Sequence, residues 1–109
     1  MINYKPGDIV LVAFPFSSGG QSKNRPAMVV LDTGDADILV ARVTTHDWRD
    51  DQDVVIHNWK QAGLLAPSIV RLHKLATLEK PLIQRRLGGL DRKDHSAISE
   101  ALRRLYGDW

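Results

Sequence analysis

Residues 8–32 read DIVLVAFPFSSGGQSKNRPAMVVLD, two apolar runs separated by a polar, glycine-rich segment. The runs at residues 8–14 and 27–31 are short and rich in Ile, Val and Leu, a pattern typical of buried β-strands. Pro26 is expected to open the second strand, because proline is tolerated at the start of a strand. Residues 17–24 are predicted to form a flexible loop between the two strands.

Further short apolar runs follow toward the C terminus, separated by turn residues such as those at 32–35. They predict strands at residues 38–45, 53–57, 68–72, 75–78 and 82–87. Asn58 is expected to cap a short helix that Gly63 ends, and Gly88 with Gly89 is expected to turn the chain.

The last segment has the pattern of an amphipathic helix. Asp91 suits the N-cap position, and Asp94 stands where the acid of a capping box would. Apolar residues recur at helical spacing at Ile98, Ala101, Leu102 and Leu105. Many short strands followed by one helix predict a mainly β fold, a small and strongly bent antiparallel sheet or barrel packed on a C-terminal helix.

Composition narrows the classes of function. The chain has 109 residues, 43% hydrophobic and 26% charged, which suits one folded domain over residues 1–109. It has no cysteine, which excludes disulfides, thiolate nucleophiles and cysteine-ligated metal sites. We expect no signal peptide and no membrane span, because residues 9–14 are too short for either, and we therefore expect a cytoplasmic protein.

The net charge of +2 is unevenly distributed along the chain. Residues 32–60 carry seven acidic and three basic side chains, whereas residues 61–109 carry nine basic and five acidic ones. Residues 1–31 carry three basic side chains and one acidic one. Basic ends around an acidic middle suit a polyanion or an acidic peptide, and a solvated surface without a partner explains the charges equally well.

Polar residues gather at the ends of two predicted strands. If the strands at 27–31 and 38–45 pair as a hairpin, Arg25 comes near Thr44 and His46. The guanidinium matches phosphate oxygens, the hydroxyl can donate to one of them, and the imidazole can carry a proton near neutral pH. These three residues therefore suit a phosphodiester site.

Each of these side chains also has an ordinary structural explanation. An arginine before a proline is usually solvated, and threonine favours strands for steric reasons. A single histidine at a strand end is usually a surface residue. The acidic run from Asp47 to Asp53 fits no calcium-loop pattern, so a solvated loop explains it better than a divalent-metal site.

The sequence resembles the MazF/PemK family of type II toxins. Matching segments occur in the family's order across nearly the whole chain, at residues 6–12 (PGDIVLV), 14–16 (FPF), 23–30 (KNRPAMVV), 41–45 (ARVTT), 59–65 (WKQAGLL), 67–72 (PSIVRL), 74–78 (KLATL) and 87–90 (LGGL). The resemblance implies an SH3-like barrel with a C-terminal helix, usually as a homodimer.

The resemblance also implies a function. It implies a metal-independent and cofactor-free endoribonuclease that cuts single-stranded mRNA at specific sequences, using the substrate's own 2′-hydroxyl. An antitoxin protein would mask the RNA groove. The alternative is a non-catalytic binder of the same fold, either a CcdB-like gyrase inhibitor or a degenerate toxin that only docks a partner.

Roles carry over to individual residues. The family's active arginine falls on Arg25, and its hydroxyl residue falls on Thr44. His46 is a candidate for proton transfer and lies where the family pattern has no histidine. The expected RNA contacts from the loop and its ends are Lys23, Asn24, Ser17 and Phe16.

Overall fold

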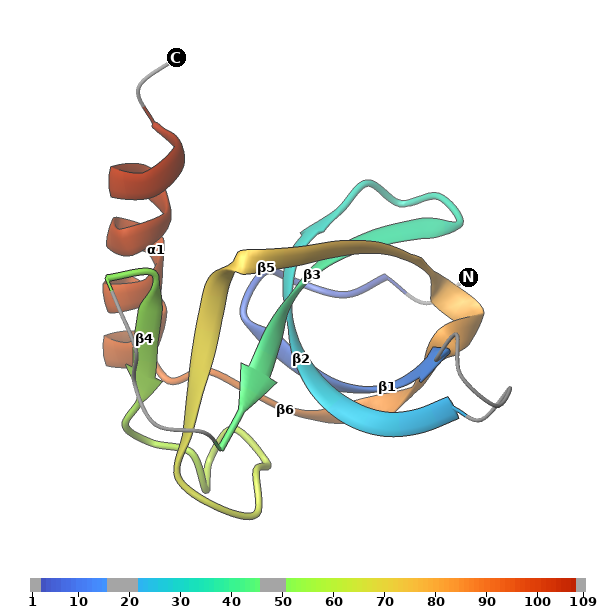
Figure 1. Cartoon of the computed structure of the whole chain (residues 1–109), viewed down its shortest axis with the longest axis horizontal. Coiled ribbons are helices and arrows are strands. Elements are labelled where there is room, and N and C mark those ends of the chain that lie inside the picture. Colours follow the sequence, from blue (N-terminus) through green and yellow to red (C-terminus); the bar gives the residue numbers. More distant parts are fainter. Residues whose placement is uncertain (1–2, 16–21, 46–50, 108–109) are drawn as a thin grey trace.

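The computed structural model describes residues 3–15, 22–45 and 51–107 (Figure 1). Its strands are β1 (Asp8–Pro15), β2 (Ser22–Asp32), β3 (Asp37–Thr44), β4 (Asp53–Ile56), β5 (Ser68–Glu79) and β6 (Ile83–Gly89). A 3-10 turn, η1 (Lys80–Leu82), precedes β6, and the helix α1 (Arg92–Tyr106) follows it. No helix in these ranges is long and apolar enough to cross a membrane.

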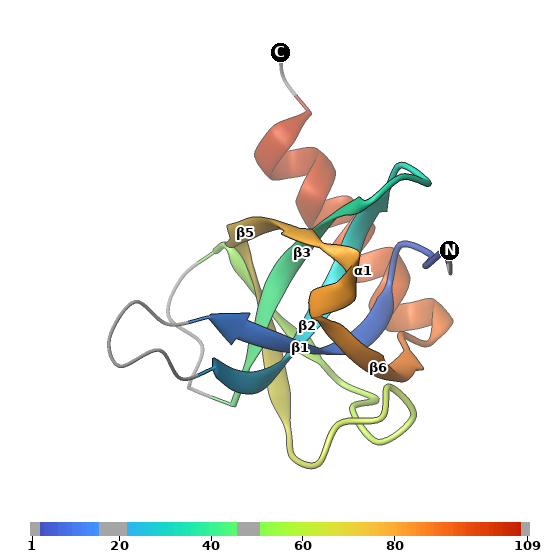
Figure 2. The same cartoon turned by 90° about the vertical axis from the view of Figure 1, so that its right-hand side faces the viewer.

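The six strands form one antiparallel sheet in the order β4-β5-β3-β2-β1-β6. The long strands curl strongly, so β5 and β6 approach one another around the hollow side of the sheet (Figure 2). Within the described ranges β4 and β6 are not paired, so the sheet stays open. The prediction of a small, bent antiparallel β fold with a C-terminal helix is confirmed, in the form of an unclosed barrel.

Both faces of the sheet are apolar. Ile9, Met28 and Val43 point to the side covered by α1 and pack with Ile98 of that helix. The opposite, concave side holds a second buried cluster, made of Val10, Val12, Ala27, Val29, Ile38 and Val40. Because successive side chains of a strand point to opposite faces, two buried faces require an unbroken apolar run, as residues 9–12 have.

Two predicted strand boundaries are wrong. Pro26 lies inside β2, opposite Leu11, and is tolerated there because the pairing of β2 with β3 begins only at Ala27. The segments 68–72 and 75–78 are one strand, β5. A single step along β3 corresponds to a jump from Leu75 to Arg71 on β5, so residues 72–74 form a bulge within a continuous strand.

The predicted helix after β4 and the turn at Gly88 and Gly89 are also wrong. Residues 57–63 form successive turns, although Gly63 does take the left-handed conformation, with φ of +85°. Gly88 and Gly89 lie in β6 and pair with β1. A Cβ atom on Gly88 would lie 2.5 Å from the Ala62 carbonyl oxygen, so glycine lets the turn pack directly against the strand.

The start of α1 confirms one capping prediction and corrects another. The Asp91 carboxylate accepts the Asp94 backbone N–H at 2.8 Å, and this bond with one from the Asn58 amide lowers the pKa of Asp91. Asp94 forms no capping box. Asp94 is buried, with 2% of its surface exposed. Its carboxylate accepts hydrogen bonds from the backbone N–H groups of His57 and Asn58 at 3.1 and 2.8 Å. It thereby ties the helix to the turns after β4.

A buried ion pair joins η1 to the end of β2. Lys80 of η1 lies 2.8 Å from the Asp32 carboxylate at the end of β2. The same carboxylate accepts the Tyr4 backbone N–H at 2.7 Å. The hydrogen bond from Lys80, followed by the one from Tyr4, lowers the pKa of Asp32 to about 2. These contacts attach the N-terminal segment to the sheet.

Candidate functional site

The register of the sheet brings Arg25 and Thr44 together. Ala27 pairs with Arg42 across β2 and β3, so continuing this antiparallel register by two residues sets Arg25 level with Thr44. Residues that face each other in adjacent strands share a face. Arg25 also pairs with Val12 of β1, so both side chains belong to the concave face of the sheet.

A hollow of about 270 Å³ opens where β2 begins and β3 ends. We call it the Thr44 hollow; its lining residues are Lys23, Asn24, Arg25, Pro26, Val43, Thr44, Thr45 and Ser68. Thr44 is only 8% exposed, and Arg25 is half-buried with its Nε atom out of contact with solvent. The expected meeting of arginine and hydroxyl is therefore present, and both side chains are held by their surroundings.

The remaining predicted site residues divide into two groups. Lys23 and Asn24 are exposed at the rim of the Thr44 hollow. His46, Ser17 and Phe16 lie outside the described residues.

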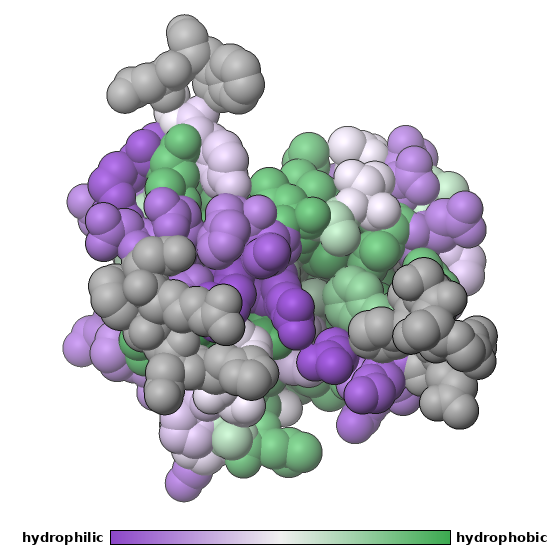
Figure 3. Space-filling view, in the orientation of Figure 1, coloured by the Kyte–Doolittle hydropathy of each residue, from purple (hydrophilic) through white to green (hydrophobic). Residues whose placement is uncertain are grey.

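A second hollow, of about 280 Å³, lies beside the first. We call it the Lys74 hollow; its lining residues are Phe14, Arg25, Val40, Arg42, Lys74, Leu75 and Ala76. Arg25 belongs to both hollows and stands at their boundary. On the face of the molecule that Figure 3 shows, apolar surface lies next to a band of hydrophilic side chains.

Sequence reasoning missed Arg42 and Lys74. Arg42 could have been found, because it lies two residues before Thr44 on a regular stretch of β3 and therefore shares its face. Lys74 could not, because its place at the hollow depends on the bulge of β5, which shifts the register with β3.

The cations near the hollows are paired to different degrees. Arg71 lies 2.8 Å from the Asp53 carboxylate, and their side chains are 6% and 0% exposed. Asp53 is therefore a buried ion-pair partner, which corrects its interpretation as part of a solvated loop. Arg42, which pairs with Arg71 across β3 and β5, is exposed, as is Lys74. Within the described ranges, neither Arg42 nor Lys74 makes a side-chain hydrogen bond or ion pair.

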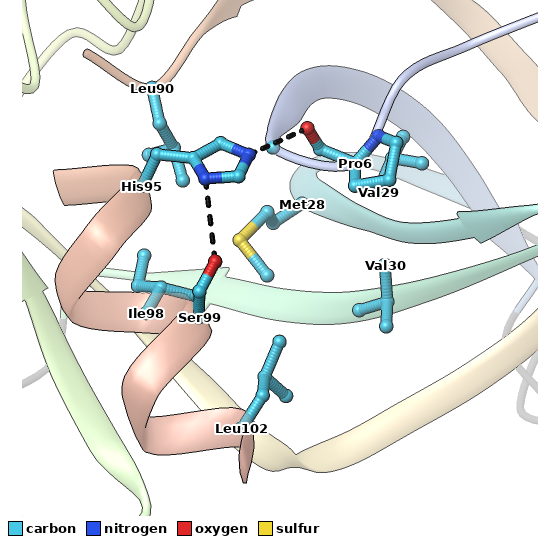
Figure 4. A pocket seen from close by; sticks show the side chains of 10 residues that line it. Pro6, Met28, Val29, Val30, Leu90, His95, Ile98, Ser99 and Leu102 are labelled. Carbon is cyan, nitrogen blue, oxygen red and sulfur yellow. Dashed lines mark hydrogen bonds between the residues drawn. The ribbon is translucent and has the colours of Figure 1, made fainter. Parts of the chain in front are cut away.

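A third hollow lies beneath α1, where His95 faces Pro6 and Met28 (Figure 4). Its volume is about 30 Å³, room for little more than a water molecule. The His95 ring lies between the Pro6 carbonyl oxygen, 3.2 Å from Nε2, and the Ser99 hydroxyl, 3.4 Å from Nδ1. This arrangement attaches the helix to the N-terminal segment, and its size does not suit a substrate.

The chemistry of the larger hollows is that of an anion site. A guanidinium offers several N–H donors in a fixed plane that matches phosphate oxygens, and a partly buried one acts at lower dielectric than bulk water. The Thr44 hydroxyl can donate a further hydrogen bond. Among the residues that the structure describes, no group of three or more His, Asp or Glu side chains could hold a metal ion.

The chain matches one family model over residues 5–106, that of the PemK-like, MazF-like toxin of type II toxin–antitoxin systems. No curated protein matches it by sequence. The match extends from before β1 to the last residue of α1, so it includes the six described strands and both of the larger hollows.

Several solved structures share the fold. A mycobacterial endoribonuclease superposes with a TM-score of 0.77 at 18% identity, covering 100% of this chain and 97% of that one. The toxin MazF-mt6 of Mycobacterium tuberculosis gives 0.72 at 22% identity, covering 96% and 100%. MazF in a MazE–MazF crystal form from Deinococcus radiodurans gives 0.77 at 17% identity, covering 99% and 100%.

Proposed function

The chain belongs to the PemK-like, MazF-like toxin family of type II toxin–antitoxin systems, and from this premise we propose that it is a sequence-specific endoribonuclease acting on single-stranded mRNA. The observation that carries the proposal is the Thr44 hollow, where Arg25 and Thr44 line one space at the ends of adjacent strands. Two of the structural neighbours are an endoribonuclease and a MazF toxin. We also propose that residues 1–109 form one toxin domain.

The reaction is a transesterification within the RNA. The 2′-oxygen attacks the adjacent phosphorus, the bond from phosphorus to the 5′-oxygen breaks, and the products are a 2′,3′-cyclic phosphate and a 5′-hydroxyl. The 2′-hydroxyl loses a proton and the departing 5′-oxygen gains one, so the reaction consumes no water, and we propose that it proceeds without a metal. Arg25 stabilises the negative charge that builds up on the phosphoryl oxygens, and Thr44 positions the phosphate by a hydrogen bond.

The remaining roles follow from position and side-chain chemistry. Arginine keeps its proton at neutral pH, so Arg25 acts first through charge. His46 is the proposed proton carrier, because imidazole titrates near neutral pH. Lys23 anchors a phosphate at the rim, and Asn24, Ser17 and Phe16 contact the RNA.

The proposed partners follow from the family and the charges. A toxin of this class is neutralised by a cognate antitoxin, and one structural neighbour is MazF crystallised with MazE. The exposed cations of the Lys74 hollow suit an acidic segment as well as RNA. We further propose a homodimer in the cytoplasm, where mRNA is translated. The CcdB-like or purely docking alternative is less favoured, because the matching family model is the PemK/MazF one.

Mapping RNA ends tests the proposal directly. Purified protein incubated with a mixed mRNA pool should produce new 5′-hydroxyl ends within one short sequence motif, and cleavage should persist in excess EDTA. Sequencing the ends after enzymatic 5′-phosphorylation measures both results. Intact RNA at every protein concentration would contradict the ribonuclease proposal. Loss of cleavage in EDTA with recovery on adding a divalent ion would contradict the metal-free mechanism.

A further inference from the structure

We propose that the Lys74 hollow is a second RNA subsite, which binds the nucleotide next to the scissile phosphate. The inference rests on the proposed ribonuclease function of the Thr44 hollow and goes beyond it. It assigns Arg42 and Lys74 to the phosphate and Phe14 to the base. These residues determine substrate affinity and sequence preference, while Arg25 and Thr44 carry out the chemical step.

The shared arginine connects the two hollows. Arg25 lines both, with Thr44 on one side and Arg42 on the other. A single strand that presents its scissile phosphate to Arg25 and Thr44 must continue away from that point on the surface. The Lys74 hollow is the adjoining space, so it is placed to receive the neighbouring nucleotide.

The cations of the Lys74 hollow are placed for a ligand. Arg71, next to Arg42 across the sheet, is buried and already paired with Asp53. Arg42 and Lys74 are exposed at the same hollow and have no carboxylate partner in the described parts of the chain. Like charges gathered at one concavity repel one another, and an RNA phosphate removes that repulsion while releasing counterions.

The floor of the hollow is apolar. Val40 is buried and pairs with Ala76 of β5 on the concave side of the sheet, and Phe14 is half-buried beside them. An aromatic ring beside an apolar floor suits the face of a nucleobase, because stacking on aromatic side chains is a general way to hold unpaired bases. An apolar floor with a cationic rim matches a nucleotide better than a bare phosphate.

The bulge of β5 positions Lys74. Bulges redirect side chains and are common beside active sites. Residues 72–74 are the ones added, and Leu72 is fixed on both sides: its N–H donates to the Gln52 carbonyl at 2.9 Å and its carbonyl accepts the Tyr106 hydroxyl at 2.7 Å. The last turn of α1 therefore holds the bulge that presents Lys74.

RNA binding without cleavage tests the subsite. The probe is a fluorescein-labelled hexanucleotide of mixed sequence with 2′-O-methyl groups, which lack the attacking hydroxyl. Fluorescence anisotropy is measured for the full chain and for Arg42→Gln/Lys74→Gln over a series of salt concentrations. The charge-matched control is Arg92→Gln/Lys93→Gln, two exposed cations at the start of α1. Thermal melts confirm that all the variants are folded.

The double variant should bind about tenfold more weakly, and its log–log salt dependence should be shallower by about 0.7 for each lost phosphate contact. The control should bind like the parent. Cleavage of mRNA by the double variant should show a higher KM with kcat little changed. Equal binding by the double variant and its control, or no binding of the probe by the parent, would overturn the subsite.

A second variant separates a nucleotide from a phosphate. Phe14→Leu removes the aromatic face while keeping an apolar side chain, and it should weaken the hexanucleotide without weakening competition by inorganic phosphate. Unchanged hexanucleotide affinity would overturn the assignment of a base to this hollow. Failure of the subsite is distinguishable from failure of the proposed function. If the parent binds the probe but leaves mRNA intact, the subsite stands and the ribonuclease proposal fails. If the parent cleaves mRNA and the subsite variants bind and cleave like the parent, the ribonuclease proposal stands and the subsite fails.

Discussion

The two faces of the same sheet differ in how completely they are filled. The face against α1 is filled by packed apolar side chains, and hydrogen bonds join His95, Asp94 and Tyr106 to other segments. The hollow that remains there has a volume of only about 30 Å³. The concave face has an apolar centre but opens at one end into hollows of about 270 and 280 Å³ with cationic rims. The helix face therefore contributes mainly to stability, and the open concave face is the one to which we assign the proposed chemistry.

The largest expected effect is at the boundary of the two open hollows. Arg25→Ala should lower the cleavage rate by roughly 10²–10³-fold, because it removes the group proposed to stabilise charge on the phosphate. Its melting temperature should stay close to that of the parent, since Arg25 adds little to either apolar cluster. RNA cleavage and growth arrest on expression measure the loss. A variant that cuts at the parental rate would remove Arg25 from the mechanism.

The converse substitution is on the helix face. Ile98 is 3% exposed in the cluster beneath α1, and Ile98→Ala should reduce the free energy of unfolding by about 2–5 kcal/mol through lost burial and a cavity. Cleavage per folded molecule should be unchanged. Denaturant unfolding gives the first quantity, and cleavage well below the melting temperature gives the second. A large fall in kcat with normal stability would contradict the division between the two faces.

Acid should test the ion pair that attaches the N-terminal segment. The pKa of Asp32 is lowered from 3.8 to about 2, chiefly by its hydrogen bond with Lys80. A carboxyl whose pKa is lower in the folded state stabilises the fold above its ordinary pKa, and this stabilisation is lost as the pH falls from about 4 to about 2. Asp32→Asn should be less stable at neutral pH and should show a flatter decline over that acid range. An equally steep decline would show that another group causes it.

The smallest expected effect is at the contact between α1 and the bulge. Tyr106→Phe removes the hydroxyl that donates to the Leu72 carbonyl and should reduce stability by about 1 kcal/mol. If this bond also positions Lys74, binding of the uncleavable hexanucleotide should weaken while kcat stays unchanged. The variant that combines Tyr106→Phe with Lys74→Gln should then bind no more weakly than Lys74→Gln alone. That result would sharpen the comparison, because it would show that the helix face affects the open hollow through Lys74.

Much of the fold could be predicted because local patterns and long-range packing agree. The apolar run of β1 and the spacing of Ile98 and Ala101 each indicate one structure, and the turn at 32–35 correctly implied that Arg25 and Thr44 meet. These features depend on residues within or next to an element.

The errors arose where contacts between distant segments decide the structure. Asp94 binds the turns after β4 instead of its own helix start, and Gly88 serves a close approach to Ala62 instead of a turn. The acidic run that includes Asp53 fits no metal-loop pattern and therefore suggests a solvated loop, and no local pattern indicates the buried pair with Arg71, 18 residues away. The role of Lys74 could not be predicted, because the bulge in β5 is defined by its register with β3 and no pattern within β5 alone indicates it.

The bulge of β5 at residues 72–74 is a place where the chain length can vary without disturbing the strand pairing around it. Strand pairing is intact on both sides of it, with Ser68 and Arg71 toward one end and Leu75 onward toward the other. A residue inserted or deleted here would shift Lys74 while leaving the positions of Arg25 and Thr44 as they are. Under the proposed roles of the two hollows, the RNA preference could thus be altered independently of the rate of cleavage.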